Sequence, residues 1–248
     1  MSKSSISPMS SVSNKKILVV TEGVKDEPQV IKKLAEIYGL SSNVEIVTYG
    51  TNIHRMMHAL EKERNLEDID IQLLLCEVDR MNSEKSLEIK KLYDNYTDKI
   101  FIFDLEYQDQ YYDASKLLRF IEAMNDSTGD LGKLFINYPM WESYYFSDVA
   151  PQYFHANFKK GEIKRLAHQT QEWILYNKNK LDDDSYKKLL NAQASRYATE
   201  LGRQYDAESG VELFEKQDKN IKNNKIALIN SSVLFFIDYL GKEKVLGK

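Results

Sequence analysis

The sequence predicts an α/β fold: a mainly parallel four-stranded sheet flanked by helices, with a C-terminal helical extension. Two observations predict it. Short apolar, β-branched segments alternate with segments of helical periodicity as far as about residue 149, and beyond that point the strand signals fade. The 248 residues are 42% hydrophobic and 29% charged, which suits a packed core. We expect a disordered Ser-rich tail at 1–14, the sheet domain at 15–149 and the helical extension at 150–248.

The elements follow in order along the chain. Buried strands are expected at 16–21 (KILVVT), 43–49 (NVEIVTY), 99–103 (KIFIF) and 133–136 (KLFI). The first helix, at 27–38, has Pro28 in its first turn and Gly39 as its stop. Further helices are expected at 52–64, 83–96 and 113–124, from Trp141 onward, and at 186–205 and 226–240. Residues 69–80 fit a buried strand or a buried helix equally well.

Composition excludes several classes of protein. Cys76 is the single cysteine, so the chain has no internal disulfide, and a cytoplasmic location is the simplest expectation. No apolar run is long enough to span a membrane. A net charge of −4 is unlike that of a nucleic-acid coat protein, so contact with nucleic acid would depend on local patches. One basic patch contains Lys159, Lys160, Lys164 and Arg165, and its ordinary interpretation is a solvated helix face.

Acidic residues follow three of the expected strands. Glu22 ends the first strand, and Asp26 and Glu27 follow it closely. Asp104 and Glu106 end the strand at 99–103, with Asp109 nearby, and Glu142 follows the last strand. In an open α/β sheet, ligands bind beyond the carboxyl ends of the strands. Side chains two residues apart on a strand point to the same side, so Asp104 and Glu106 are expected to ligate one ion together.

The chemistry expected at this edge is that of a hard divalent cation. Carboxylate oxygens favour Mg²⁺ or Mn²⁺. Glu22 would be a ligand or a general base, and Lys25, in the turn after it, would bind substrate. Glu77 and Asp79 also follow an apolar run and remain the competing metal pair if the run before them is a strand.

The same segments resemble a known family. The segment at 17–34 resembles the first motif of RloB-type and OLD-type TOPRIM proteins, in which an apolar strand is followed by Glu-Gly and then by [Ser/Thr]-Glu. The segment FIFDLEYQD at 101–109 resembles their acidic motif. The segment INYPMWESYYF at 136–146 is similar to a stretch found in RloB-like and AbiL-type proteins. The chain departs from the family pattern at Asp26, where Ser or Thr is common, and in having Asp-x-Glu rather than Asp-x-Asp.

The resemblance implies a metal-dependent nuclease, a hydrolase that serves as toxic effector in bacterial antiviral defence by abortive infection. It would be similar in kind to the TOPRIM effector of the PARIS system. The resemblance also implies Glu22 as the catalytic glutamate, Asp104 and Glu106 as the metal-binding pair, and Glu27 and Glu142 as supporting acids. It implies an ABC- or OLD-type ATPase partner and a nucleic-acid substrate, with RNA favoured over DNA and tRNA as one candidate. A homodimer stays open. The alternative, suggested by the tyrosine-rich extension, is a non-catalytic module that docks on such an ATPase.

Overall fold

A four-stranded parallel sheet forms the centre of the molecule. The computed structural model describes residues 15–60, 96–147, 155–159 and 161–247. Neighbouring strands are all parallel, in the order β2-β1-β3-β4. The strands are β1 (Ile17–Thr21), β2 (Val44–Thr48), β3 (Asp98–Asp104) and β4 (Lys133–Asn137). The predicted α/β class and parallel sheet are therefore confirmed, and each strand lies within one residue of its expected ends.

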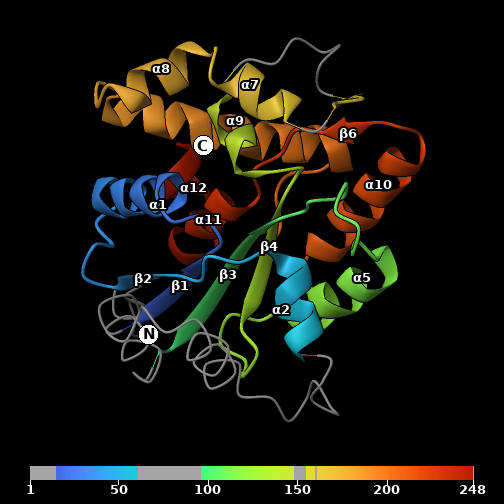
Figure 1. Cartoon of the computed structure of the whole chain (residues 1–248). Helices are drawn as coiled ribbons and strands as arrows, with labels where there is room; N and C mark the ends of the chain where they lie inside the picture. Colours follow the sequence, from blue (N-terminus) through green and yellow to red (C-terminus); the bar gives the residue numbers. More distant parts are fainter. Residues whose placement is uncertain (1–14, 61–95, 148–154, 160, 248) are drawn as a thin grey trace, which may run out of the picture.

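Helices cover the sheet because its central strands are apolar on both faces. All five residues of β1 are buried, as a strand between two helical layers requires. The crossover helices are α1 (Asp26–Ile37), α2 (Ile53–Leu60) and α5 (Ala114–Ala123). The helices α2 and α5 contact each other on one side of the sheet, while α11 (Phe235–Leu240) lies on the other (Figure 1).

Local signals set the ends of these helices. Gly39 adopts φ +73° just after α1, the left-handed conformation that its lack of Cβ allows at low cost. The carboxylate of Asp113 accepts a hydrogen bond from the N–H of Lys116 (3.0 Å) and so caps α5. The expected elements at 69–80 and 83–96, with Glu77 and Asp79, lie outside the described residues.

The strand order places a topological switch point between β1 and β3. From β1 the chain goes outward to β2, and it then returns to the other side of β1 to form β3 and β4. The crossovers on the two sides of this point lead away from each other, so neither of them covers the carboxyl ends of β1 and β3. Ligands bind at such a switch point in doubly wound sheets. Glu22 directly follows β1, and Asp104 is the last residue of β3.

The C-terminal region differs from its expected form in two places. The expected helix at 226–240 is wrong, because only its last part, α11, is an α-helix. It is preceded by the short strand β6 (Ile226–Ala227), a polar loop and the 3₁₀ helix η3 (Ser232–Leu234). The strand β6 pairs antiparallel with β5 (His155–Ala156), so this region also contains a strand pair where none was expected.

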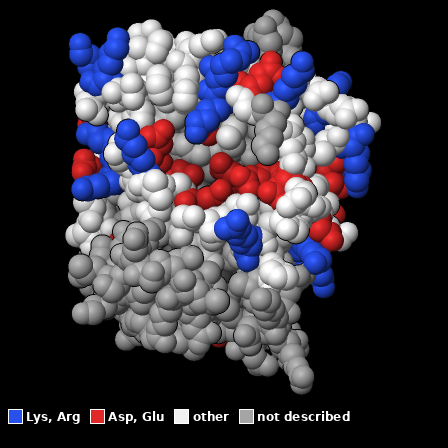
Figure 2. Space-filling view, viewed as in Figure 1, with Lys and Arg blue, Asp and Glu red and all other residues white. Residues whose placement is uncertain are grey.

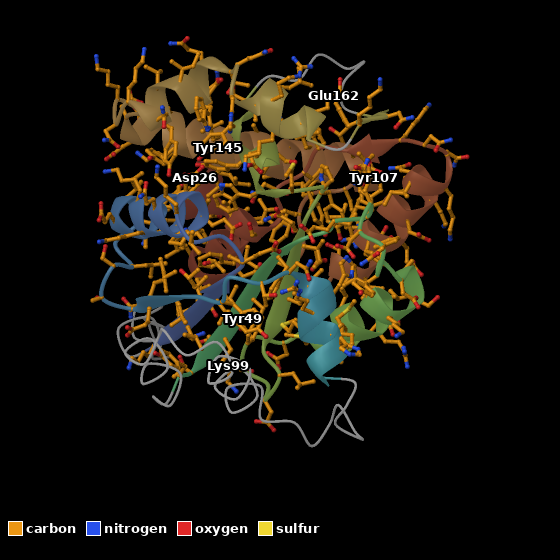
Figure 3. All side chains as sticks on the ribbon, viewed as in Figure 1. Asp26, Tyr49, Lys99, Tyr107, Tyr145 and Glu162 are labelled. Atoms are coloured by element: carbon orange, nitrogen blue, oxygen red, sulfur yellow. The ribbon has the colours of Figure 1, made fainter. Side chains whose placement is uncertain are left out.

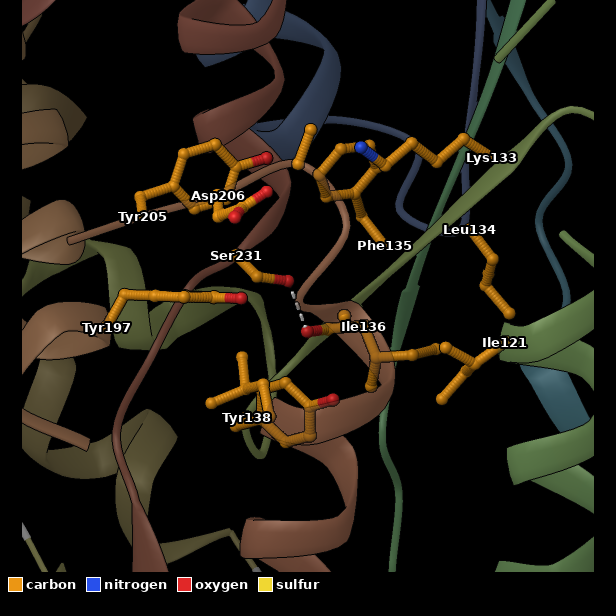
Figure 4. Close-up of a pocket in the computed structure, with 13 residues that line it drawn as sticks. Ile121, Lys133, Leu134, Phe135, Ile136, Tyr138, Tyr197, Tyr205, Asp206 and Ser231 are labelled. Carbon is orange, nitrogen blue, oxygen red and sulfur yellow. Dashed lines mark hydrogen bonds between the residues drawn. The ribbon is translucent and has the colours of Figure 1, made fainter. Parts of the chain in front are cut away.

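The polar residues of this loop explain why the helix does not form there. The side chain of Asn230 donates to the carbonyl of Trp141 (3.1 Å), and its backbone N–H donates to Gln193 Oε1 (2.9 Å). The hydroxyl of Ser231 donates to the carbonyl of Ile136 (2.6 Å), as Figure 4 shows beside β4. The side chain of Asn230 also accepts the N–H of Val233 (3.4 Å), and such local bonds from Asn and Ser side chains compete with helix formation.

The other C-terminal helices lie partly over one end of the sheet and partly beside α5 and α11 (Figure 1). The helix expected at 186–205 is α9 (Asp183–Leu201), which begins earlier because Asp182 caps it and ends at Gly202, whose φ is +69°. The helix expected from Trp141 onward is a short 3₁₀ helix, η2 (Trp141–Tyr145). The remaining helices are α7 (Glu162–Ala167), α8 (Gln171–Asn177), α10 (Gly210–Lys222) and α12 (Lys242–Leu246).

Both parts of the chain share one hydrophobic core. Buried residues of the sheet and of the C-terminal helices belong to a single cluster. Tyr38, just after α1, has its ring centroid 5.8 Å from that of Phe236 in α11. Among the described residues, no helix is long and apolar enough to cross a membrane.

Candidate active site

Glu22 and Asp104 form the centre of the candidate site. The strands β1 and β3 are in register with Thr21 opposite Ile102, so the chain that leaves β1 passes the end of β3. The backbone N–H of Asp104 donates a hydrogen bond to Glu22 Oε2 (3.2 Å). The structure therefore brings together two acids that are 82 positions apart. It does so at the switch point of the sheet.

The Glu-Gly turn positions a third acid, Glu27. The N–H of Gly23 donates to Glu27 Oε2 (3.0 Å), and Thr21 Oγ1 donates to the carbonyl of Gly23 (3.0 Å). A Cβ on residue 23 would lie 2.8 Å from Glu27 Oε1, too close for any ordinary contact. A side chain at residue 23 would therefore displace the end of Glu27, whose buried carboxylate closes against the turn. This contact explains why Glu-Gly and a glutamate five residues after Glu22 occur together.

Asn137 holds the carboxylate of Asp104. Asn137 is the fully buried last residue of β4, and its Nδ2 donates to Asp104 Oδ1 (3.2 Å). The hydroxyl of Ser232 donates in turn to Asn137 Oδ1 (2.8 Å). A chain of hydrogen bonds thus leads from the C-terminal loop to the site. The sequence pattern predicted no role for Asn137, and it predicted that Ser232 would lie inside the helix expected at 226–240.

Glu142 enters the site from η2 and has a cationic partner. Its side chain is 10% exposed, and Lys164 Nζ lies 3.3 Å from its Oε1. Lys164 extends from α7, and its side chain is 58% exposed. The basic patch was expected to be a solvated helix face, yet one of its members reaches the acidic cluster. Only the density of positive charge around 159–165 could have indicated this from the sequence.

Glu106 reaches the site by a route different from the expected one. The strand β3 ends at Asp104, and Glu106 has φ +43°, so the argument from strand alternation is wrong at this residue. The chain turns because the N–H of Leu105 donates to the carbonyls of Asn137 and Pro139, both at 3.1 Å. Glu106 nevertheless lies close enough to raise the pKa of Glu22. Its Oε2 is buried and has no hydrogen-bond partner among the described residues.

The other expected residues lie at the margin of the cluster. Asp26 Oδ1 is 3.4 Å from the hydroxyl of Tyr176, and Asp26 also lies close to Tyr145 (Figure 3). Asp109 accepts the N–H of Tyr111 (2.8 Å) within its own turn. Lys25 is exposed just before α1. Five acids are therefore gathered at the switch point: Glu22, Glu27, Asp104, Glu106 and Glu142.

Burial and mutual repulsion perturb the acids of this cluster. Burial, followed by the charges of Glu106, Glu27 and Glu142, raises the pKa of Glu22 to about 8 against the Asp104 hydrogen bond. Burial and the charge of Asp104 raise the pKa of Glu27 to about 9. Burial and the charge of Glu22 also raise the pKa of Asp104 well above its ordinary range, although Asn137 opposes the shift. The protein alone therefore does not stabilise a full set of negative charges at neutral pH.

The chemical type of the available ligand atoms suits a hard divalent cation. The five acids offer only carboxylate oxygens, which suit Mg²⁺ or Mn²⁺, and Glu106 offers a buried oxygen without a hydrogen-bond partner in the described structure. Within residues 15–60, 96–147, 155–159 and 161–247, no three Asp, Glu, His or Cys side chains are already arranged as a ligand set. Side-chain rotation would therefore have to accompany binding of the ion.

Acidic side chains also gather on the molecular surface. Figure 2 shows acidic side chains gathered in a band across one face, with Lys and Arg side chains on both sides of it. Such an arrangement provides positive charge for a polyanion beside a site that attracts cations. Comparison of the chain with protein-family models, with curated proteins and with solved structures gave no match. The function is therefore argued from the site itself.

Proposed function

We propose that this chain is a Mg²⁺- or Mn²⁺-dependent TOPRIM nuclease that cleaves phosphodiester bonds. One observation carries the proposal. Glu22 and Asp104, which follow adjacent central strands, are joined by a hydrogen bond at the switch point of a parallel sheet, within a cluster of buried acids. Clustered acids whose pKa values are raised by burial and by one another are typical of functional sites rather than of solvated turns.

The residues of the chain divide the work of such a reaction. Asp104, Glu106 and Glu22 would hold the ion. When bound, the ion would act as a Lewis acid and offset the negative charge of a phosphate. In the metal-free protein the pKa of Glu22 is raised to about 8, so this carboxyl exchanges a proton near neutral pH; a bound ion would lower that pKa and favour the carboxylate that serves as a ligand or general base. Asn137 keeps the carboxylate of Asp104 in place. Lys164, exposed beside the acids, supplies positive charge for a phosphate oxygen.

The biological role in this proposal follows from the family resemblance. The motifs at 17–34, 101–109 and 136–146 are similar to those of TOPRIM effectors of phage defence. We therefore propose a cytoplasmic toxin of abortive infection, regulated by an ABC- or OLD-type ATPase, with RNA favoured over DNA as the substrate and tRNA as one candidate. Genes for such an ATPase beside this one would support the proposal.

A cleavage assay tests the activity directly. The purified chain is incubated with labelled RNA and DNA in Mg²⁺, Mn²⁺ or EDTA, beside the variants Glu22→Gln and Glu122→Gln. Glu122 is an exposed acid on α5 and serves as the matched control. We expect cleavage that depends on the divalent ion, that Glu122→Gln retains and that Glu22→Gln reduces at least a hundredfold. Equal cleavage by the wild type and Glu22→Gln would contradict the site.

The docking alternative predicts a different result in cells. The tyrosines that suggested it are largely internal: Tyr176, Tyr186, Tyr197 and Tyr205 are each at most 8% exposed and stabilise the chain's own core. The nuclease proposal requires that Glu22→Gln abolish protection against phage. Full protection by Glu22→Gln, together with a stable ATPase complex, would instead support the docking module.

A further inference from the structure

A pocket adjoins the acidic cluster on the side of Glu106. It has a volume of about 120 Å³ and lies between the loop after β3, the start of η2 and the segment that leads into α7. Its walls are mainly apolar, and its rim carries polar groups. The lining consists of Glu106, Tyr107, Gln108, Asp109, Pro139, Met140, Phe158, Lys159, Gly161 and Ile163.

Hydrogen bonds fix one wall of this pocket. The hydroxyl of Tyr107 donates to the carbonyl of Phe158 (3.3 Å), and Gln108 Nε2 lies 2.9 Å from that hydroxyl and 3.0 Å from the same carbonyl. The N–H of Lys159 donates to Glu162 Oε2 (2.9 Å), which ties the next residue to the start of α7. Tyr107 and Glu162 are labelled in Figure 3. The tyrosine ring is thus held in position before any ligand arrives.

The size of the pocket selects the class of ligand. A cavity of about 150 Å³ accommodates one benzene ring in an engineered protein, whereas a water molecule takes about 30 Å³. A volume of about 120 Å³, open on one side, therefore suits one planar aromatic ring rather than a solvent molecule or a peptide segment. Tyr107 is half-buried, and Phe158 and Ile163 are almost fully buried, so an inserted ring would meet a firm apolar surface.

The position of the pocket indicates where that ring would come from. Glu106 lines the pocket and also raises the pKa of Glu22, so the pocket and the acidic cluster share this residue. Lys159 is exposed at the rim and can meet a phosphate. An aromatic ring joined to a phosphate that reaches the acids is a nucleotide. We propose that this pocket, given the nuclease function proposed above, binds one unstacked nucleobase beside the scissile phosphate, so that single-stranded nucleic acid is preferred over duplex.

Binding without cleavage tests the proposal. The wild-type protein in EDTA is titrated into three short fluorescein-labelled oligonucleotides: single-stranded oligodeoxyadenylate, a strand of equal length with abasic sugars, and the adenylate strand in a duplex. Stacking of one base on protein aromatics is worth about 1–3 kcal/mol. We therefore expect the single strand to bind about tenfold more tightly than the abasic strand. Equal affinity for these two strands would overturn the assignment and leave the pocket to an aromatic side chain of a protein partner.

Variants connect the preference to the pocket. Tyr107→Ala should remove the tenfold preference and Tyr107→Phe should retain it, because phenylalanine keeps the ring. Tyr111→Ala is the matched control, since Tyr111 lies in the same loop, is 68% exposed and does not line the pocket. A preference unchanged in Tyr107→Ala would overturn the location, and the wild-type comparison stands even if that variant does not fold. Displacement of the labelled strand by adenosine monophosphate shows whether the pocket also binds a free nucleotide.

The two proposals fail separately. Tighter binding of the adenylate strand than of the abasic strand, without cleavage, would support the nucleobase pocket and contradict the nuclease proposal. Cleavage that needs Glu22, with equal binding of adenylate and abasic strands, would support the nuclease and contradict the pocket.

Discussion

Replacing Glu22 by glutamine should stabilise the metal-free protein at alkaline pH. Burial and the nearby carboxylates raise the pKa of Glu22 from 4.5 to about 8. In the unfolded chain the same carboxyl ionises near its ordinary value, so between these two values folding takes up a proton. The stability contributed by protonated Glu22 is fully present below about pH 4.5 and decreases as the pH rises towards 8. Glutamine keeps an oxygen that can accept the Asp104 N–H and removes only the charge.

The size of this effect follows from the shift. One pKa unit corresponds to about 1.4 kcal/mol, so a shift from 4.5 to about 8 sets a ceiling of about 5 kcal/mol. Part of the shift comes from repulsion by other acids of the cluster, which is relieved when they are protonated. We therefore expect Glu22→Gln to gain roughly 2–3 kcal/mol at pH 8.5 and under about 1 kcal/mol at pH 5. At pH 8.5 this corresponds to an increase in Tm of roughly 4–12 °C for a chain of this length.

Thermal unfolding in EDTA at both pH values checks this expectation, with Glu122→Gln as the control that should follow the wild type. A Glu22→Gln protein that is no more stable than the wild type at pH 8.5 would refute the reasoning from burial. Adding Mg²⁺ at pH 8.5 should stabilise the wild type more than Glu22→Gln, by up to about 2.7 kcal/mol at a hundred times the Kd. This measurement reports binding of the ion independently of cleavage.

Three further variants probe the groups around the centre. Gly23→Ala should push Glu27 out of its hydrogen bond, because the new Cβ would lie 2.8 Å from Oε1, and should reduce cleavage by at least tenfold in the nuclease assay. Ser232→Ala should lower the free energy of unfolding in urea by about 1 kcal/mol, since it removes the bond to Asn137. Lys164→Gln should change stability by less than about 1 kcal/mol because the lysine end of the ion pair is largely exposed to solvent. The same variant should weaken binding of single-stranded DNA and reduce its dependence on salt.

The sheet could be predicted because its signals are local. Each strand is a short apolar run between polar turns, and the burial of all five residues of β1 is the pattern of a parallel strand covered on both faces. The helix expected at 186–205 begins three residues earlier than predicted, at Asp183, because the side chain of Asp182 caps it by accepting the N–H of Ser185. The order of the strands, and with it the switch point between β1 and β3, is a property of the topology that no single segment encodes.

The acids of the site were predicted to differing degrees. Glu22 and Asp104 directly follow clear strands, and their position was fixed as soon as β1 and β3 became neighbours. Glu106 was predicted with the wrong reason, because its position depends on hydrogen bonds from Leu105 to the loop after β4 rather than on strand alternation. Lys164 was not predicted as a site residue, since its contact with the cluster depends on how α7 packs beside η2.

The hydrogen bond between Ser232 and Asn137 joins residues 95 positions apart, and no periodicity encodes such a contact. The sequence still contains a physical signal for it. Residues 226–237 are apolar except for three consecutive polar residues, Asn230, Ser231 and Ser232. A buried polar group without a partner costs about 1–3 kcal/mol, so three of them in an apolar run imply distant polar partners. Asn137, a buried polar residue at the end of an apolar strand, needs a partner for the same reason. The loop at 230–232 supplies that partner, so these residues belong to the site and not to the helix expected at 226–240.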